Sequence, residues 1–382
     1  MRRNSFLLVP LLSLLLHAYI GVRLLPALSL SGLGLAVATV LLLLSALLMP
    51  APLLLRLSRL PQRAGDALAW AGYLAMGVFS SLFVLTLLRD LVLLPFALWA
   101  VWHPLDLEAW KRASAFAVLA LTALVSLIGL FNARRTARVV QVDVPIAGLP
   151  AALSGFRIAQ LSDVHVGPTI KRGYLEAIVQ RVNTLDADLI ALTGDIVDGS
   201  VEALREHVQP LSALRSRHGS YCVTGNHEYY HGAHGWVREW RSLGLRVLLN
   251  ANEVIEHGGA KLLVGGVTDY SAGHFDEQHR SDPLAAVRNT QKVDARLLLA
   301  HQPRSAQAAA EAGFDLQISG HTHGGQFLPW NFFVPLQQPF VAGLAKLGRL
   351  WVYTSRGTGY WGPPLRFGAP SEITLLRLVA AQ

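Results

Sequence analysis

The sequence has 382 residues, 52% of them hydrophobic, and a formal net charge of +8 at pH 7. Its mean hydropathy of +0.38 is too high for an ordinary soluble protein, so part of the chain is expected to lie in a membrane. The positive excess belongs to residues 1–138, which contain 12 Lys and Arg against 4 Asp and Glu, whereas residues 139–382 contain 21 of each. Because the second part is neutral, it offers no basic groove and no nucleic-acid partner is expected.

The chain contains a single cysteine, and its histidines are unevenly distributed. Cys222 is the only cysteine, which excludes an intramolecular disulfide, a multi-thiolate zinc site and a CxxC redox centre. Histidine is concentrated in the second part of the chain, where 12 of the 14 lie after residue 138. That concentration indicates metal or proton chemistry there.

Four apolar stretches precede residue 138, at residues 6–22, 28–49, 68–88 and 114–131. Each approaches the roughly 20 residues that a helix needs to cross a hydrocarbon core about 30 Å thick, and only helices are plausible there. The sequence therefore predicts a four-helix transmembrane region over residues 1–138. A cleavable signal peptide is the alternative for the first stretch, but a small-residue cleavage site is missing and three more spans follow. The run 91–102 is too short to span and is expected to extend the third helix or lie at the interface.

Loop charges predict the orientation. One side of the membrane would carry eight cations: Arg2, Arg3, Arg56, Arg59, Arg63, Arg134, Arg135 and Arg138. The opposite loops contain four: Arg23, Arg89, Lys111 and Arg112. Because positive charge favours the cytoplasmic side, both termini and the domain after residue 138 are expected in the cytoplasm. An odd number of spans, which would place that domain outside, is the alternative.

Residues 139–382 have the pattern of a globular α/β domain, with short β-rich runs between polar turns and helical stretches. Strands are predicted at residues 156–162, 189–193, 220–224, 261–267, 296–300, 316–319, 350–354 and 372–378. Helical spacing is found at residues 172–185 and 201–215.

Five polar motifs each follow a predicted strand: LSDVHVG with Asp163 and His165, LTGDIVDG with Asp195, VTGNHEYY with Asn226 and His227, LLAHQP with His301, and ISGHTHGGQ with His321 and His323. Side chains at the carboxyl ends of strands in α/β sheets converge on one crevice, so these residues are expected to meet. Imidazoles together with carboxylates suit Mn, Fe or Zn, and the donors suffice for two divalent metal ions.

These motifs resemble, in order, the D-x-H, GD, GNH(E/D), lone H and GHTH signatures of the calcineurin-like metallophosphoesterase family. The resemblance covers about residues 150–382 and implies a two-sheet β-sandwich flanked by helices, with βαβ motifs. Within the family the chain is most similar to a bacterial, membrane-anchored branch, through GHTHGGQ and the C-terminal SRGTG…PLRFGAPSEITLL from Ser355 to Leu376. It is therefore expected in the inner or plasma membrane of a bacterium.

The resemblance also implies roles for individual residues. One metal ion would be held by Asp163, His165 and His323, the other by Asn226, His301 and His321, with Asp195 shared between them. His227 would contact the phosphoryl group and protonate the leaving oxygen, a role that suits an imidazole.

The expected function is hydrolysis of a phosphodiester or pyrophosphate bond by a metal-activated hydroxide, with a lipid or lipid precursor as the candidate substrate. The competing interpretation is a transport or scaffold protein with a regulatory or inactive phosphoesterase domain. It finds little support, because the spans contain no charged residue at their centres. No protein partner is inferred.

Several residues near the motifs can be interpreted in two ways. Asp198 is a helix cap or part of the site, and Glu228 is expected to accept hydrogen bonds rather than bind metal. His231 and His234 lie in a solvated loop or line the pocket. Arg356 and Arg366 bind an anion or form structural salt bridges, and the aromatic segment 327–340 meets the membrane interface or packs as a lid.

Overall fold

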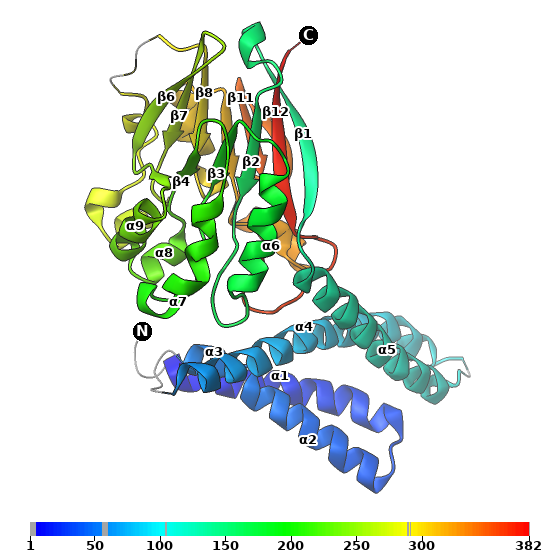
Figure 1. The fold of residues 1–382 in the computed structure, drawn as a ribbon. Helices are drawn as coiled ribbons and strands as arrows, with labels where there is room; N and C mark the ends of the chain where they lie inside the picture. The colour runs from blue at the N-terminus through cyan, green and yellow to red at the C-terminus, as the bar shows by residue number, and fades with distance from the viewer. Residues whose placement is uncertain (1–4, 56–59, 104, 289, 291, 382) are drawn as a thin grey trace. The chain divides into compact units, whose positions relative to one another are not determined.

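The computed structural model describes residues 5–55, 60–103, 105–288, 290 and 292–381 (Figure 1). Four of the arginines used to predict orientation lie outside the described residues, namely Arg2, Arg3, Arg56 and Arg59. The chain divides into two compact units. The first comprises Met1–Phe131 with Gly362–Leu365, and the second comprises Asn132–Trp361 with Arg366–Gln382.

The first unit is helical. Its long helices are α1 (Ser5–Leu28), α2 (Gly32–Leu48), α4 (Gln62–Trp99) and α5 (Leu107–Arg134), with the short α3 (Ala51–Leu54) after α2. Among the described residues, four helices are long and apolar enough to cross a membrane, and at most 22% of each span's most apolar window is buried in the protein. Exposed apolar side chains of this kind require lipid, so the chain is a membrane protein.

The helices differ from the predicted stretches mainly in length. The run 91–102 extends the third helix as far as Trp99, with Pro95 inside it, and is not a separate interfacial segment. Some of the polar groups that these helices bury bond to one another. The hydroxyl of Ser13 donates to the carbonyl of Ala46 at 2.7 Å, and the ring of His17 bonds to the Ser13 carbonyl and to the Ser45 hydroxyl. These contacts give His17 a structural role within the bundle.

The second unit contains two six-stranded mixed sheets. The first has the order β1 (Arg138–Ile146), β12 (Glu372–Ala380), β2 (Arg157–Leu161), β3 (Leu189–Leu192), β4 (Ser220–Cys222) and β5 (Arg246–Val247). The second has the order β10 (Gly343–Leu347), β11 (Leu350–Thr354), β9 (Leu316–Ser319), β8 (Ala295–Leu299), β7 (Ala260–Gly266) and β6 (Ala251–His257). Within them, β2 to β5 are mutually parallel, as are β7, β8, β9 and β11.

The two sheets pack face to face and carry helices on their outer sides. A core of apolar side chains from both sheets fills the space between them, including Ile158 and Leu189 from one sheet and Val264 and Ile318 from the other. A second core lies between the first sheet and its helices, which include α6 (Arg172–Asn183), α7 (Val201–Val208) and α9 (Ala233–Ser242). A third joins the second sheet to α10 (Ala306–Glu311). The predicted two-sheet sandwich flanked by helices is thus confirmed, and β2–α6–β3 is a βαβ unit.

The strands that the sequence predicted are the inner ones. All eight predicted runs correspond to strands with two neighbours, which are mostly apolar because their residues are buried. The four described strands that were not predicted are the edges, β1, β5, β6 and β10. Helix α7 is shorter than its predicted stretch, because Pro210 follows it and the chain continues as a 3-10 turn.

Candidate metal centre

Five strands of the second unit end beside one another and carry the polar motifs. Asp163 and His165 follow β2, Asp195 follows β3, Asn226 follows β4, His301 follows β8, and His321 and His323 follow β9. The first three of these strands belong to one sheet and the last two to the other. The site therefore lies where the carboxyl ends of both sheets meet, as expected for an α/β crevice.

The backbone at these positions is unusual. Among the non-glycine residues with positive φ are five of the seven predicted metal ligands: Asp163, His165, Asp195, His321 and His323, with φ between 51° and 70°. A left-handed conformation is costly for a residue with a side chain and persists only where the surroundings enforce it. Such strain concentrated in one place is typical of a functional site.

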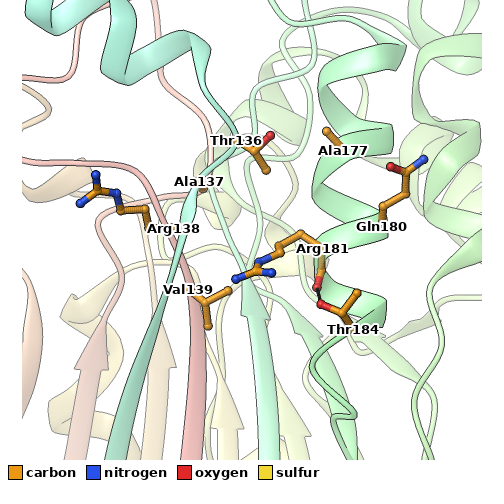
Figure 2. A pocket seen from close by; sticks show the side chains of 8 residues that line it. All are labelled: Thr136, Ala137, Arg138, Val139, Ala177, Gln180, Arg181 and Thr184. Carbon is orange, nitrogen blue, oxygen red and sulfur yellow. Dashed lines mark hydrogen bonds between the residues drawn. The ribbon is translucent and has the colours of Figure 1, made fainter.

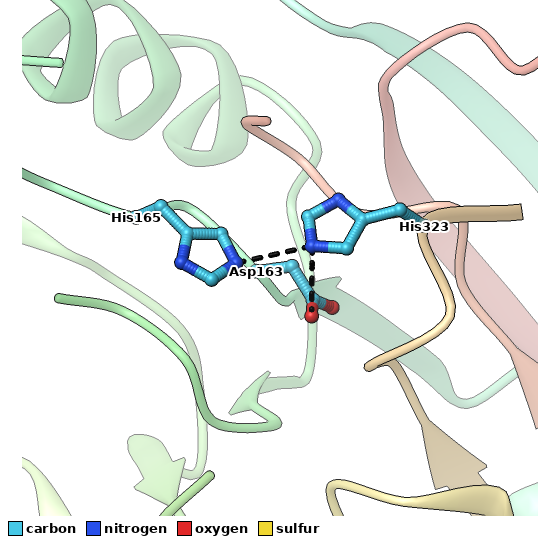
Figure 3. A group of neighbouring side chains, drawn as sticks. All are labelled: Asp163, His165 and His323. Carbon is cyan, nitrogen blue, oxygen red and sulfur yellow. Dashed lines mark hydrogen bonds and ion pairs between the residues drawn. The ribbon is translucent and has the colours of Figure 1, made fainter. Parts of the chain in front are cut away.

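The first cluster consists of Asp163, His165 and His323, whose ligand atoms lie within 4.8 Å of one another (Figure 3). The Nε2 atoms of the two histidines are 3.0 Å apart, and Nε2 of His323 lies 3.5 Å from Oδ1 of Asp163. All three residues are buried. Two imidazole nitrogens and a carboxylate oxygen thus converge on one point away from bulk water.

The second cluster surrounds the ring of His301. Its Nδ1–H donates to the carbonyl of Thr193 at 2.8 Å, which turns Nε2 toward the site. That Nε2 lies 3.1 Å from Oδ2 of Asp195, 3.2 Å from Oδ1 of Asn226 and 3.2 Å from Nδ1 of His321. A ligating histidine usually has its other ring nitrogen fixed in this way. The sequence-predicted set for the second ion is therefore brought together.

Asp195 lies between the two clusters. It shares one group of ligand atoms with His301 and His321 and another with His165 and His227. Its Oδ1 also accepts a hydrogen bond of 2.8 Å from the backbone N–H of His227. A carboxylate in this position can contact two ions at once.

Asp198 belongs to the site. Its helix-cap interpretation is wrong, because the residue before α7 is Ser200. Instead the Asp198 carboxylate accepts a hydrogen bond from Nδ1–H of His227, and its Oδ2 lies 3.3 Å from Nδ1 of His165. His231 is nearby, with Nε2 4.0 Å from Oδ1 of Asp198, so it lines the site. The short spacing between Asp195 and Asp198 was the only signal in the sequence.

Glu228 holds the motif loops together, as the sequence analysis expected. Its carboxylate accepts three backbone hydrogen bonds, from Asp195 at 2.9 Å, Ile196 at 2.8 Å and Gly225 at 2.7 Å. The side chain is fully buried. Glu228 thus connects the turn after β3 with the start of α8 (Asn226–Tyr230), which carries Asn226 and His227.

Two glycines leave room for the carboxylates. A Cβ atom at Gly225 would lie 2.2 Å from Oδ1 of Asp195, and one at Gly320 would lie 2.1 Å from Oδ2 of Asp163. Neither carboxylate can move without leaving its cluster. Any side chain at these positions would therefore displace a predicted ligand.

Both C-terminal arginines have structural contacts. Arg366 is fully buried and donates to the carbonyls of Gly359 and His323, and its Nη2 lies 2.9 Å from Nδ1 of His323. Burial lowers the pKa of its guanidinium to about 10. Arg356 donates to Glu372 at 2.9 Å. These contacts favour the structural interpretation of both residues over direct contact with a substrate.

The charges in the site shift its pKa values. Burial opposes protonation of His227, but the carboxylates of Asp195 and Asp198 outweigh it and raise the pKa of this imidazole to about 9. Burial and the neighbouring His301 lower the pKa of His321 to about 3. Burial and the Asp195 carboxylate raise the pKa of Glu228 to about 7. Shifts in opposite directions within one cluster are common in functional sites.

A separate hollow of about 700 Å³ lies between the start of β1 and α6 (Figure 2). Its lining includes Arg138 and Arg181 but none of the sequence-predicted metal ligands. It is therefore distinct from the site formed by the motifs.

We expect Glu228→Gln to weaken metal binding by about 10-fold to 100-fold, because an amide would turn an N–H group toward backbone donors that now meet a carboxylate. Metal content measured by mass spectrometry after dialysis at fixed free Mn²⁺ tests this. Glu256→Gln, at an exposed glutamate on β6, is the matched control. Equal metal content in the two variants would contradict a role for Glu228 in holding the metal-binding residues in place.

Comparison with known proteins agrees with this geometry. A family model described as calcineurin-like phosphoesterase matches residues 156–325. A Bos taurus transmembrane protein with metallophosphoesterase domain is 40% identical over 279 residues, which cover 70% of this chain and 62% of that protein. An uncharacterized metallophosphoesterase of Helicobacter pylori is 39% identical over 225 residues, 58% of this chain and 60% of that one. The matches thus span less than two thirds of these two relatives.

A further relative is matched over most of its length. An uncharacterized metallophosphoesterase of Campylobacter jejuni is 34% identical over 302 residues, which cover 78% of each chain. The motifs, the two-sheet sandwich and these similarities lead to the same assignment. The chain belongs to the calcineurin-like phosphoesterase family.

Proposed function

We propose that the protein is a membrane-anchored, metal-dependent phosphoesterase that hydrolyses a phosphodiester or pyrophosphate bond. The observation that carries this proposal is the pair of His and Asp clusters, with Asp195 between them in reach of His165 on one side and of His301 and His321 on the other. Residues 1–138 would form the membrane region and residues 139–382 the catalytic domain.

The residues of the site fit two divalent ions. Asp163, His165 and His323 would hold one ion, Asn226, His301 and His321 the other, and Asp195 both. Mixed imidazole and carboxylate donors suit Mn, Fe or Zn. The Nε2 atoms of His165 and His323, which lie 3.0 Å apart, can also both bind one cation.

When bound, the two ions supply Lewis-acid stabilisation of the phosphoryl oxygens and lower the pKa of water. His227 is the residue we assign to the leaving oxygen. Its Nδ1–H is held by Asp198, and its Nε2 lies 3.9 Å from Oδ2 of Asp195, on the side of the clusters. A histidine fixed by a carboxylate at one nitrogen can transfer a proton at the other.

The substrate is proposed to be amphiphilic, because exposed aromatic rings surround His227. Ring centroids of Tyr230 and Trp361 lie 5.1 Å and 5.8 Å from that of His227, and Phe275 lies 5.6 Å from Tyr230. About half of the surface of each of these rings is exposed, at 49%, 52% and 53%. We call Tyr230, Phe275 and Trp361 the aromatic rim. An apolar group attached to the reacting phosphate would bury part of this surface.

Further apolar surface lies in the segment 327–340, where Phe332 is 72% and Leu336 is 80% exposed. Side chains this exposed do not pack as a lid on the domain. This observation supports a lipid or lipid precursor as the substrate, in line with the membrane helices of the chain. The GHTHGGQ motif supports assignment to the bacterial, membrane-anchored branch of the family.

The transport or scaffold alternative has no specific observation in its favour. The charged side chains near one end of α4 pair with one another, since Asp90 accepts hydrogen bonds from Arg23 and Tyr19 and contacts Arg89 at 3.1 Å. Such pairing satisfies the charges locally and leaves no evident ion path through the described helices.

We expect purified full-length protein in detergent to hydrolyse bis-p-nitrophenyl phosphate when Mn²⁺ is added. Asp195→Asn and His323→Ala should lower both metal content and turnover, the latter by about 100-fold or more. His227→Ala should lower kcat by a similar factor while metal content is kept. His274→Ala, at an exposed histidine, is the control. Turnover that survives in Asp195→Asn would overturn the assignment of the site.

Phe275→Ala should reduce kcat/KM for a p-nitrophenyl phosphodiester with a dodecyl second ester by roughly 10-fold, because about 1.5 kcal/mol of apolar contact is lost. The methyl ester, which cannot reach the rim, should be nearly unaffected. Leu284→Ala, at an exposed residue outside the rim, is the matched control. An equal loss for both esters would contradict an apolar role for the aromatic rim.

We also propose that the catalytic domain lies in the cytoplasm of a bacterium, on the basis of the arginine-rich loops. Alkaline phosphatase fused after Arg138 should then be inactive, since it requires an oxidising compartment. A green fluorescent protein at the same position should fluoresce. The reverse pair of results would place the domain outside and imply an odd number of spans.

A further inference from the structure

A second group of metal-ligand side chains lies apart from the motif residues. His234, Asp276 and His279 bring one ligand atom each to within 4.8 Å of one another. His234 is near the start of α9, whereas Asp276 and His279 belong to the 3-10 turn Glu277–His279 and its N-cap. None of the five sequence motifs includes them. We propose that these three residues form a separate binding site for a single transition-metal ion, of which Zn²⁺ is the best match.

The distances fit such an ion. Nε2 of His234 and Oδ2 of Asp276 are 3.0 Å apart, and the ring centroids of His234 and His279 are 4.8 Å apart. Tetrahedral zinc with bonds of about 2.1 Å separates its ligand atoms by roughly 3.4 Å. The exposed side chain of His234, at 66%, can make the small adjustment that remains. Two imidazoles and one carboxylate leave a fourth position for water.

In two of these side chains, the nitrogen or oxygen that would not bind the ion already has a hydrogen-bond partner. Nδ1 of His279 lies 2.8 Å from the hydroxyl of Tyr229, which can accept the Nδ1–H and so leaves Nε2 for an ion. Oδ1 of Asp276 accepts the backbone N–H of Gln278 at 3.0 Å, which leaves Oδ2. This kind of outer contact orients the ligands in protein metal sites.

An ion at this position would connect two segments of the chain that lie beside the candidate metal centre. Tyr229 belongs to α8, the helix that carries Asn226 and His227, and Phe275 of the aromatic rim precedes Asp276 directly. The ion would therefore hold the segment 269–280 against α8 and α9. Its role is structural, and binding does not depend on the proposed hydrolase activity.

The experiment that tests this proposal measures the number of Zn²⁺ ions bound per chain. Full-length protein in detergent is stripped with a chelator, given a small excess of Zn²⁺, desalted and analysed for zinc by mass spectrometry. The double variant His234→Ala/His279→Ala should retain about one Zn²⁺ fewer per chain than the wild type, and Asp276→Asn should bind the ion at least ~10-fold more weakly. His274→Ala, which removes an exposed histidine of the same segment, should retain the wild-type amount.

The comparison remains informative if the candidate metal centre takes up no zinc, because the wild type would then hold about one ion and the double variant none. Unfolding temperatures of the zinc-free proteins show whether each variant is folded. Equal zinc content in the folded double variant and the wild type would overturn the proposal and leave His234 and Asp276 as an ordinary surface ion pair.

Discussion

The carboxylate of Asp195 is the group on which the rest of the site depends. It is fully buried among histidines, accepts the backbone N–H of His227 and lies 3.1 Å from Nε2 of His301. A buried carboxylate needs compensating charge or hydrogen bonds, and a second one, Asp163, is buried in the same crevice. Protein donors supply part of this compensation, and divalent cations are the partners best suited to supply the remainder.

The fold serves this arrangement by joining two sheets at their carboxyl ends. Predicted ligands from β2, β3 and β4 meet predicted ligands from β8 and β9, so each cluster contains residues of both sheets and the apolar core between the sheets holds them at a fixed separation. This arrangement strains the backbone, because five predicted ligands have positive φ. Contacts such as the three hydrogen bonds to Glu228 hold that strained conformation in place.

Sequence patterns predicted those parts of the protein that are encoded locally. Inner strands such as β3 are buried on both faces and are apolar throughout, whereas the edge strand β1 mixes valines with Gln141 and Asp143 and was missed. The motif residues were found because each predicted ligand lies within four residues of the end of a strand. The role of Asp198 was not found, because it depends on a contact with His227, 29 positions away, that spacing alone does not show.

The residues around the site, unlike the predicted ligands at its centre, are not grouped in short sequence motifs. Tyr230, Phe275 and Trp361 come from three distant segments and meet only through the positions of α8, the loop after β7 and the loop before β12. No short motif can specify such a rim, whereas the predicted metal ligands all lie in short motifs that follow strands. A phosphoesterase can therefore alter the groups that it accepts by substitutions in these loops while its centre stays the same. We therefore propose that substrate preference depends on the aromatic rim and reaction chemistry on the two clusters.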